Sequence, residues 1–181
     1  MTNIQFLFNL KVTKFMNKGK QFEQDFQKSV PKGVYCLRLT DSSPAGFGGN
    51  DNMRFSIQSP YDFILFNGQM FALELKSTKQ KSISFAGSGP MIKPHQIKEL
   101  TKAHKHGVTA GLLLNFQEIA TYFVPIDKFN SYIATTTRKS VPICDCNELG
   151  YEIPMKKLKV NFRYDLTRLL KGGKNDTNEY V

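Results

Sequence analysis

Cysteine and long apolar runs are both scarce in this sequence. Its three cysteines, Cys36, Cys144 and Cys146, follow no regular spacing, and the only close pair is Cys-Asp-Cys. This pattern disfavours a disulfide framework and a structural zinc site, and it suits a reducing cytoplasm. Residues 4–10 are apolar, but the run is too short to span a membrane and lacks the flanks of a signal peptide. We therefore expect a cytoplasmic protein with no membrane segment.

Acidic residues are also few, since 15 Asp and Glu face 25 Lys and Arg, which gives a formal net charge of +10. Such a bias favours a polyanionic partner. Nucleic acid ranks ahead of an anionic membrane because no basic amphipathic helix or lipidation motif accompanies the charge. The charge says nothing of catalysis, so a DNA-binding protein without enzymatic activity would satisfy it equally.

The 181 residues suffice for one ordinary domain. We expect an N-terminal extension or arm at 1–15, a single domain at 16–171 with a Ser-, Pro- and Gly-rich protrusion near 41–58, and a flexible tail at 172–181. Within the domain, hydrophobic periodicity alternates between helix and strand, which predicts an α/β fold. Helices are expected at about 17–29, 93–107, 125–132 and 162–170, and strands at about 34–39, 61–66, 70–77, 108–115 and 119–124.

Three charges stand in two otherwise apolar strands that Asn67-Gly68 joins into a predicted hairpin. Residues two apart on a strand share a face, so Glu74 and Lys76 point the same way. The position of Asp62 depends on the turn. A strict two-residue loop would turn Asp62 away from Glu74, whereas a three-residue loop ending at Gln69 would pair the two carboxylates.

In the three-residue register, one face of the hairpin is pure core and the other is charged at the end far from the turn. Two carboxylates there could hold a hard divalent cation, and Lys76 could steady the attacking water or the scissile phosphate of a nucleic acid. The alternative is that Glu74 and Lys76 form an ordinary surface ion pair. Because unpaired buried carboxylates are costly, a cation or a salt-bridge network is expected in either case.

Two further polar residues lie near this hairpin in the predicted fold. Gln96 falls on the apolar side of its helix near the helix start, so its amide faces inward, either toward the charged site or to cap backbone amides. Glu23 lies between Phe22 and Phe26 and is either a third acidic group near the site or a solvated helix residue. The three histidines have no spacing typical of zinc ligands.

With these residues in order, the chain resembles the PD-(D/E)XK nuclease superfamily and, more narrowly, RecU-type Holliday junction resolvases. The resemblance is carried by the Ser-Pro-Tyr-Asp entry to Asp62, by Glu74-Leu75-Lys76 followed by Ser-Thr-Lys, by a Ser-Phe element, and by the His95-Gln96 helix. It implies a restriction-endonuclease-like fold, that is, a central mixed β-sheet flanked by helices.

The resemblance also implies a magnesium-dependent endodeoxyribonuclease, with manganese as a substitute, that resolves four-way DNA junctions by symmetric nicks as a homodimer. Asp62 and Glu74 would be the metal ligands, Lys76 the catalytic lysine, Gln96 an active-site amide and Glu23 an acidic helper. Candidate DNA contacts are Arg54, Lys79, Lys81, Lys98 and Lys102. A nuclease for other branched or duplex DNA, or a non-catalytic DNA-binding protein with this fold, remains an alternative.

Overall fold

The structure is a computed structural model that describes residues 18–40 and 58–172. The expected N-terminal arm, nearly all of the expected protrusion including Arg54, and the tail after Gly172 lie outside these residues. No helix among the described residues is both long and apolar enough to cross a bilayer.

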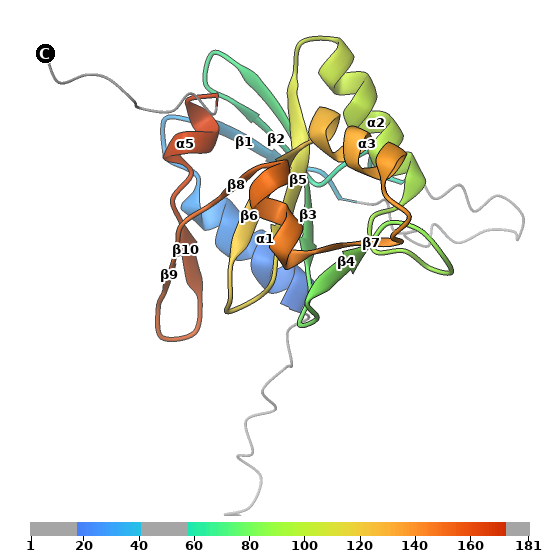
Figure 1. Cartoon of the computed structure of the whole chain (residues 1–181). Coiled ribbons are helices and arrows are strands. Elements are labelled where there is room, and N and C mark those ends of the chain that lie inside the picture. Colours follow the sequence, from blue (N-terminus) through green and yellow to red (C-terminus); the bar gives the residue numbers. More distant parts are fainter. Residues whose placement is uncertain (1–17, 41–57, 173–181) are drawn as a thin grey trace, which may run out of the picture.

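A six-stranded mixed sheet in the order β1-β2-β3-β5-β6-β8 forms the centre of the molecule (Figure 1). β3 and β5 run parallel, and the other neighbours are antiparallel. Its strands are β1 Tyr35–Arg38, β2 Phe63–Phe66, β3 Met70–Ser77, β5 Thr109–Asn115, β6 Thr121–Pro125 and β8 Tyr151–Glu152. Two small antiparallel pairs complete the strands: β4 Ser82–Ser84 with β7 Ser140–Pro142, and β9 Met155–Lys157 with β10 Phe162–Tyr164.

Helices cover both faces of the sheet (Figure 1). α2 Pro94–Lys105 and α3 Ile126–Thr135 pack on one face over Leu112, Leu114 and Val124. α1 Lys18–Ser29 packs on the other face, where the β3 and β5 side chains alternate inward with period two. Short helical turns η1 Ile143–Asp145, α4 Cys146–Leu149 and α5 Thr167–Leu170 lie in the C-terminal third. The expected α/β fold, a central mixed sheet flanked by helices, is confirmed.

Burial explains why β3 and β5 form the middle of the sheet. Six of the seven β5 residues are buried, and so are the five residues of β3 from Phe71 to Leu75. Strands that are covered on both faces have nearly continuous apolar sequences, as these two strands do. Glu74 is the charged exception within the buried part of β3, at 1% exposure. The fold thus holds one carboxylate inside its most apolar layer.

The C-terminal third departs from expectation. The sequence predicts no helix or strand between about 133 and 161, yet this segment forms β7, η1, α4, β8 and β9, all of four residues or fewer. Elements this short give no periodic signal. The single helix expected at 162–170 is wrong, because Phe162–Tyr164 forms β10 and the helix begins only at Thr167. β4 was also missed within the polar stretch after β3.

Candidate active site

The turn between β2 and β3 decides whether the predicted acidic residues meet. Phe66 pairs with Met70, which leaves three residues, 67–69, in the loop, and Gly68 takes a φ of +102° that favours glycine. The three-residue register is therefore confirmed. Pairing continues beyond β2, since the Asp62 backbone N–H donates to the Leu73 carbonyl (3.1 Å) and Asp62 Oδ2 accepts the Leu75 N–H (2.7 Å). Asp62 is thus anchored directly beside Glu74 on β3.

Glu74 has donors on one carboxylate oxygen only. Its Oε1 atom lies 2.6 Å from Lys76 Nζ and accepts a hydrogen bond from Gln96 Nε2, also at 2.6 Å. Its Oε2 atom is buried and has no hydrogen-bond partner among the described residues. A buried polar oxygen without a donor is costly. Glu74 is therefore half-satisfied, and the unsatisfied half is available for a ligand.

Both carboxylates hold their protons more tightly than free side chains do. Burial raises the pKa of Glu74, the nearby charge of Asp62 raises it further, and the Lys76 ammonium lowers it, so that the pKa reaches about 8. Burial also raises the pKa of Asp62, against the opposing effect of the hydrogen bond from Leu75. Two acids near one another in a dry environment resist carrying two negative charges. A bound cation would relieve this resistance.

Gln96 combines the two roles that the sequence left open. It is 8% exposed in the first turn of α2, where its Oε1 atom accepts the backbone N–H of Lys93 (2.9 Å) while its Nε2 atom donates to Glu74. The cap thus fixes which end of the amide faces the carboxylate. Pro94 occupies the first helical position, where its missing N–H costs nothing. The Gln96 side chain therefore caps the helix and orients Glu74 at the same time.

Glu23 reaches the same region from the opposite face of the sheet. Phe22 and Phe26 hold α1 against the core, and Glu23 lies between them, partly exposed, with Oε2 bonded to the Arg38 guanidinium. The charges of Glu23 and Arg38 shift the pKa of Asp62 up and down respectively, so both lie near it. Sequence reasoning missed Arg38, although it is the one charge in the apolar run 34–39, on the strand next to Asp62.

The described residues contain no cluster of three or more His, Cys, Asp or Glu side chains arranged to hold a metal. The acidic pair offers two carboxylates, of which Glu74 has a free buried oxygen. Magnesium commonly binds through one or two carboxylates and keeps water or phosphate oxygens for its other positions. Asp62 and Glu74 therefore fit a magnesium ion better than they fit zinc, which would require additional nitrogen or sulfur ligands.

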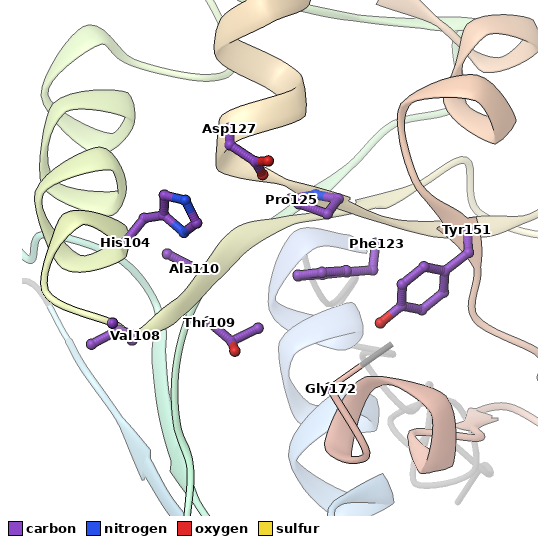
Figure 2. Close-up of a pocket in the computed structure, with 10 residues that line it drawn as sticks. His104, Val108, Thr109, Ala110, Phe123, Pro125, Asp127, Tyr151 and Gly172 are labelled. Carbon is purple, nitrogen blue, oxygen red and sulfur yellow. The ribbon is translucent and has the colours of Figure 1, made fainter. Parts of the chain in front are cut away.

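Of the predicted DNA contacts, the four that fall within the described residues lie on two segments of the chain. Lys79 and Lys81 are exposed just after β3, close in sequence to Lys76, whereas Lys98 and Lys102 are exposed on α2. The histidines lie at or beyond α2, and His104 lines a cavity of about 380 Å³ (Figure 2).

That cavity is separate from the acidic pair. It lies against Thr109, which pairs with Phe71, whereas Glu74 pairs with Leu112 further along the same strands. Figure 2 shows His104 and Asp127 on α2 and α3, with Tyr151 and Gly172 across from them. No carboxylate of the acidic pair reaches it, so it contributes nothing to the candidate site.

Comparisons with known proteins cover this region. The family described as Recombination protein U (RecU) matches residues 50–167, which include Asp62, Glu74, Lys76 and Gln96 but not Glu23. The SPbeta prophage-derived uncharacterized protein YotM of Bacillus subtilis (strain 168) is 35% identical over 170 residues, with 84% of this chain and 85% of YotM covered. A structure of Archaeoglobus fulgidus Hjc, a Holliday junction resolvase, overlaps 74% of this chain and 91% of Hjc at 20% identity, with a TM-score of 0.44. The match over about two thirds of its length shows that this chain belongs to the RecU family.

Proposed function

We propose that this protein is a structure-selective DNA endonuclease that resolves four-way junctions by metal-dependent hydrolysis of phosphodiester bonds, with Asp62, Glu74 and Lys76 as its catalytic core. One observation carries the proposal: Glu74 is buried beside Asp62 with one oxygen held by Lys76 and Gln96 and the other without a donor. A purely structural ion pair would gain nothing from leaving that atom unsatisfied. Family membership supports a role in DNA recombination.

Asp62 and Glu74 would hold the metal, for which magnesium is the first candidate and manganese a substitute. When bound, such an ion would supply Lewis-acid activation at a phosphodiester. Lys76 contributes a positive charge on the same face of β3, where it can offset the negative charge that builds on the phosphate. Gln96 keeps Glu74 in one orientation from its capped position on α2. Glu23 acts at the rim through its contact with Arg38.

Cleavage of a synthetic mobile four-way junction in magnesium or manganese tests the chemistry. We expect paired nicks placed symmetrically across the junction, and we expect Asp62→Asn to abolish them. Glu74→Gln should still bind the junction, because it removes a charge from the site without removing any basic residue. An intact junction under these conditions, or full activity in Asp62→Asn, would overturn the proposal.

The same assay can distinguish junction resolution from cleavage of other DNA substrates and from DNA binding without cleavage. A reaction that contains junction, flap and linear duplex in equal amounts should consume the junction first if the enzyme is junction-selective. Equal consumption of the three would instead identify a general nuclease for branched or duplex DNA. Tight binding with no cutting of any of them would identify a non-catalytic DNA-binding protein that keeps this fold.

The proposed homodimer has support in an exposed apolar surface. In the described part of the chain, Tyr35, Phe66 and Met70 form a cross-strand row on β1, β2 and β3 and are 59%, 51% and 41% exposed, with Leu37 beside them at 40%. These residues lie on the same face of the sheet as Asp62, which directly precedes β2. Among the described residues β1 is also an edge strand, whose outer backbone groups can pair with a second chain.

A second copy of this chain across that row would give two catalytic sites to one junction. We expect Phe66→Glu to convert a dimer to a monomer in sedimentation experiments, because it places a charge inside the apolar contact. Ile119→Glu, which alters another exposed apolar residue, at the β5–β6 turn and outside this row, is the matched control. A wild-type monomer at micromolar concentration, or a dimer that Phe66→Glu leaves intact, would contradict this surface.

A further inference from the structure

The β9–β10 hairpin is a basic element that the candidate active site does not use. Phe162 pairs with Lys157, Arg163 with Lys156 and Tyr164 with Met155, and the turn is closed by a hydrogen bond from Leu158 N–H to the Asn161 carbonyl (2.7 Å). Figure 1 shows this hairpin at the edge of the molecule, beside α1. Neither of its strands belongs to the six-stranded main sheet.

One face of the hairpin is fixed to α1. The Tyr164 ring packs edge-on against Phe22 with 5.4 Å between centroids, and the buried Asp25 carboxylate accepts the Phe162 N–H (2.9 Å). Ser29 Oγ accepts the Tyr164 N–H at 3.0 Å. The hairpin is therefore held by buried and specific contacts, and its outer face has a defined position relative to the rest of the domain.

The outer face brings two positive charges together. Lys156 and Arg163 are directly opposite one another and exposed, and neither forms an ion pair within the described ranges 18–40 and 58–172. Like charges at facing positions destabilise a strand pair. Both line a recess of about 290 Å³, and its one acidic lining residue, Asp165, accepts the Thr167 N–H and forms no ion pair with either cation within the described residues. The pair is thus arranged to gain from an external anion.

The hairpin tip continues this basic surface toward the candidate active site. Lys159 is exposed at the tip, and Val160 is 83% exposed. Val160 lines a small recess together with Lys18 at the start of α1 and Ser77, the residue that follows Lys76 on β3. Glu118 faces Lys157 there and neutralises it (2.9 Å). The tip and the catalytic end of β3 therefore lie at the same end of the sheet.

We propose that the outer face and tip of this hairpin, defined as Lys156, Lys159 and Arg163, bind the phosphate backbone of a duplex DNA arm that extends away from the cleavage site. The two aromatic residues of the hairpin, Phe162 and Tyr164, face α1, so the outer face has no ring on which unpaired bases could stack. Exposed cations without aromatic neighbours suit duplex phosphates, which are contacted through charge alone. This inference rests on the proposed function in one respect: it takes DNA as the ligand because the proposed enzyme cleaves DNA.

Binding of fluorescein-labelled DNA without divalent cations tests the inference with the full chain. The probes are a four-way junction with 20-base-pair arms and a linear duplex, titrated at several salt concentrations. Lys156→Gln combined with Arg163→Gln should weaken binding about tenfold near 0.1 M salt and reduce the slope of log Kd against log salt by about 1 to 2. Lys156→Arg combined with Arg163→Lys keeps both charges and should bind like the wild type.

Lys32→Gln combined with Lys128→Gln removes the same net charge from exposed positions outside the hairpin. If this control weakens binding as much as the hairpin variant, net charge alone explains the effect and the inference fails. Unchanged binding by a folded hairpin variant, checked by its melting temperature, also overturns it. Failure of the proposed function has a different signature, because a wild type that cuts no DNA can still bind it through the hairpin.

Discussion

Gln96 Nε2 donates to the same Glu74 oxygen that Lys76 Nζ approaches, each at 2.6 Å, and the Gln96 carbonyl oxygen is already committed to the Lys93 backbone. Two donors from different elements thus converge on one atom, while the second oxygen of the carboxylate has none. This asymmetry orients Glu74 and makes the site sensitive to changes in either donor.

Substitution of Gln96 should separate its two roles. Gln96→Glu retains an oxygen for the Lys93 amide but replaces the donor with an acid, which raises the pKa of Glu74 further. We expect cleavage to fall by at least tenfold at pH 7.5. Gln96→Ala loses the cap as well and should destabilise the fold by about 1 to 3 kcal/mol. Denaturant unfolding and single-turnover cleavage measure the two effects; equal cleavage by Gln96→Glu and wild type would contradict the assigned orientation.

Loss of Lys76 should abolish cleavage while sparing the fold at neutral pH. Lys76→Met removes the cation beside a buried carboxylate, and Glu74 avoids an uncompensated charge by keeping its proton. We expect cleavage to fall more than a hundredfold. Lys76→Arg, which keeps the charge but changes the donor geometry, should recover only part of the rate. Melting temperatures near the wild-type value in Lys76→Met at pH 7 would support proton uptake by Glu74.

The raised pKa of Glu74 predicts how stability depends on pH. Folding raises this pKa from an ordinary 4.5 to about 8, so the folded state binds the extra proton between these values. The Glu74 contribution to stability is therefore lost as pH rises from about 4.5 to about 8 in the absence of divalent ions. Glu74→Gln should remove this pH dependence. Melting temperatures at pH 5 and pH 8.5 in a chelator, compared between the two proteins, measure the difference.

Magnesium should reverse that trend. A cation held by Asp62 and Glu74 requires both carboxylates to be ionised, so it competes with the proton on Glu74. We expect the stabilisation by 10 mM magnesium to grow from pH 6 to pH 8.5 in the wild type and to be absent in Asp62→Asn. The readout is the melting temperature, which needs no DNA. Equal stabilisation of Asp62→Asn by magnesium would contradict a site at these carboxylates.

Glu23 and Arg38 provide a test of the rim of the site. Both side chains are partly exposed, so the ion pair should contribute less than about 1 kcal/mol to stability. Glu23→Gln should accordingly leave unfolding almost unchanged. Because the proposed function places Glu23 at the rim of the site, the same substitution should lower the cleavage rate by about tenfold or more. Arg38→Gln and the double variant complete a cycle that shows whether the two residues act together.

The sequence predicted the long, strongly patterned elements and most of the site's geometry. The alternation of side chains along β2 and β3 predicted that Asp62, Glu74 and Lys76 share one face if the turn has three residues. The spacing of apolar residues along α2 predicted that Gln96 faces inward. The short C-terminal elements were not predictable, because their position depends on contacts such as Tyr164 on Phe22 rather than on local pattern. Arg38 was missed because its partner, Glu23, is fifteen residues away on a helix whose placement no local pattern reports.

The three-residue turn at 67–69 sets a single register between β2 and β3, and both the hydrophobic core and the candidate active site depend on that register. A tighter turn that paired Phe66 with Gln69 would shift β2 by one position against β3, turning Phe63 and Leu65 out of the core at the same step that turned Asp62 away from Glu74. Selection for a stable core should therefore also preserve the register that brings Asp62 beside Glu74.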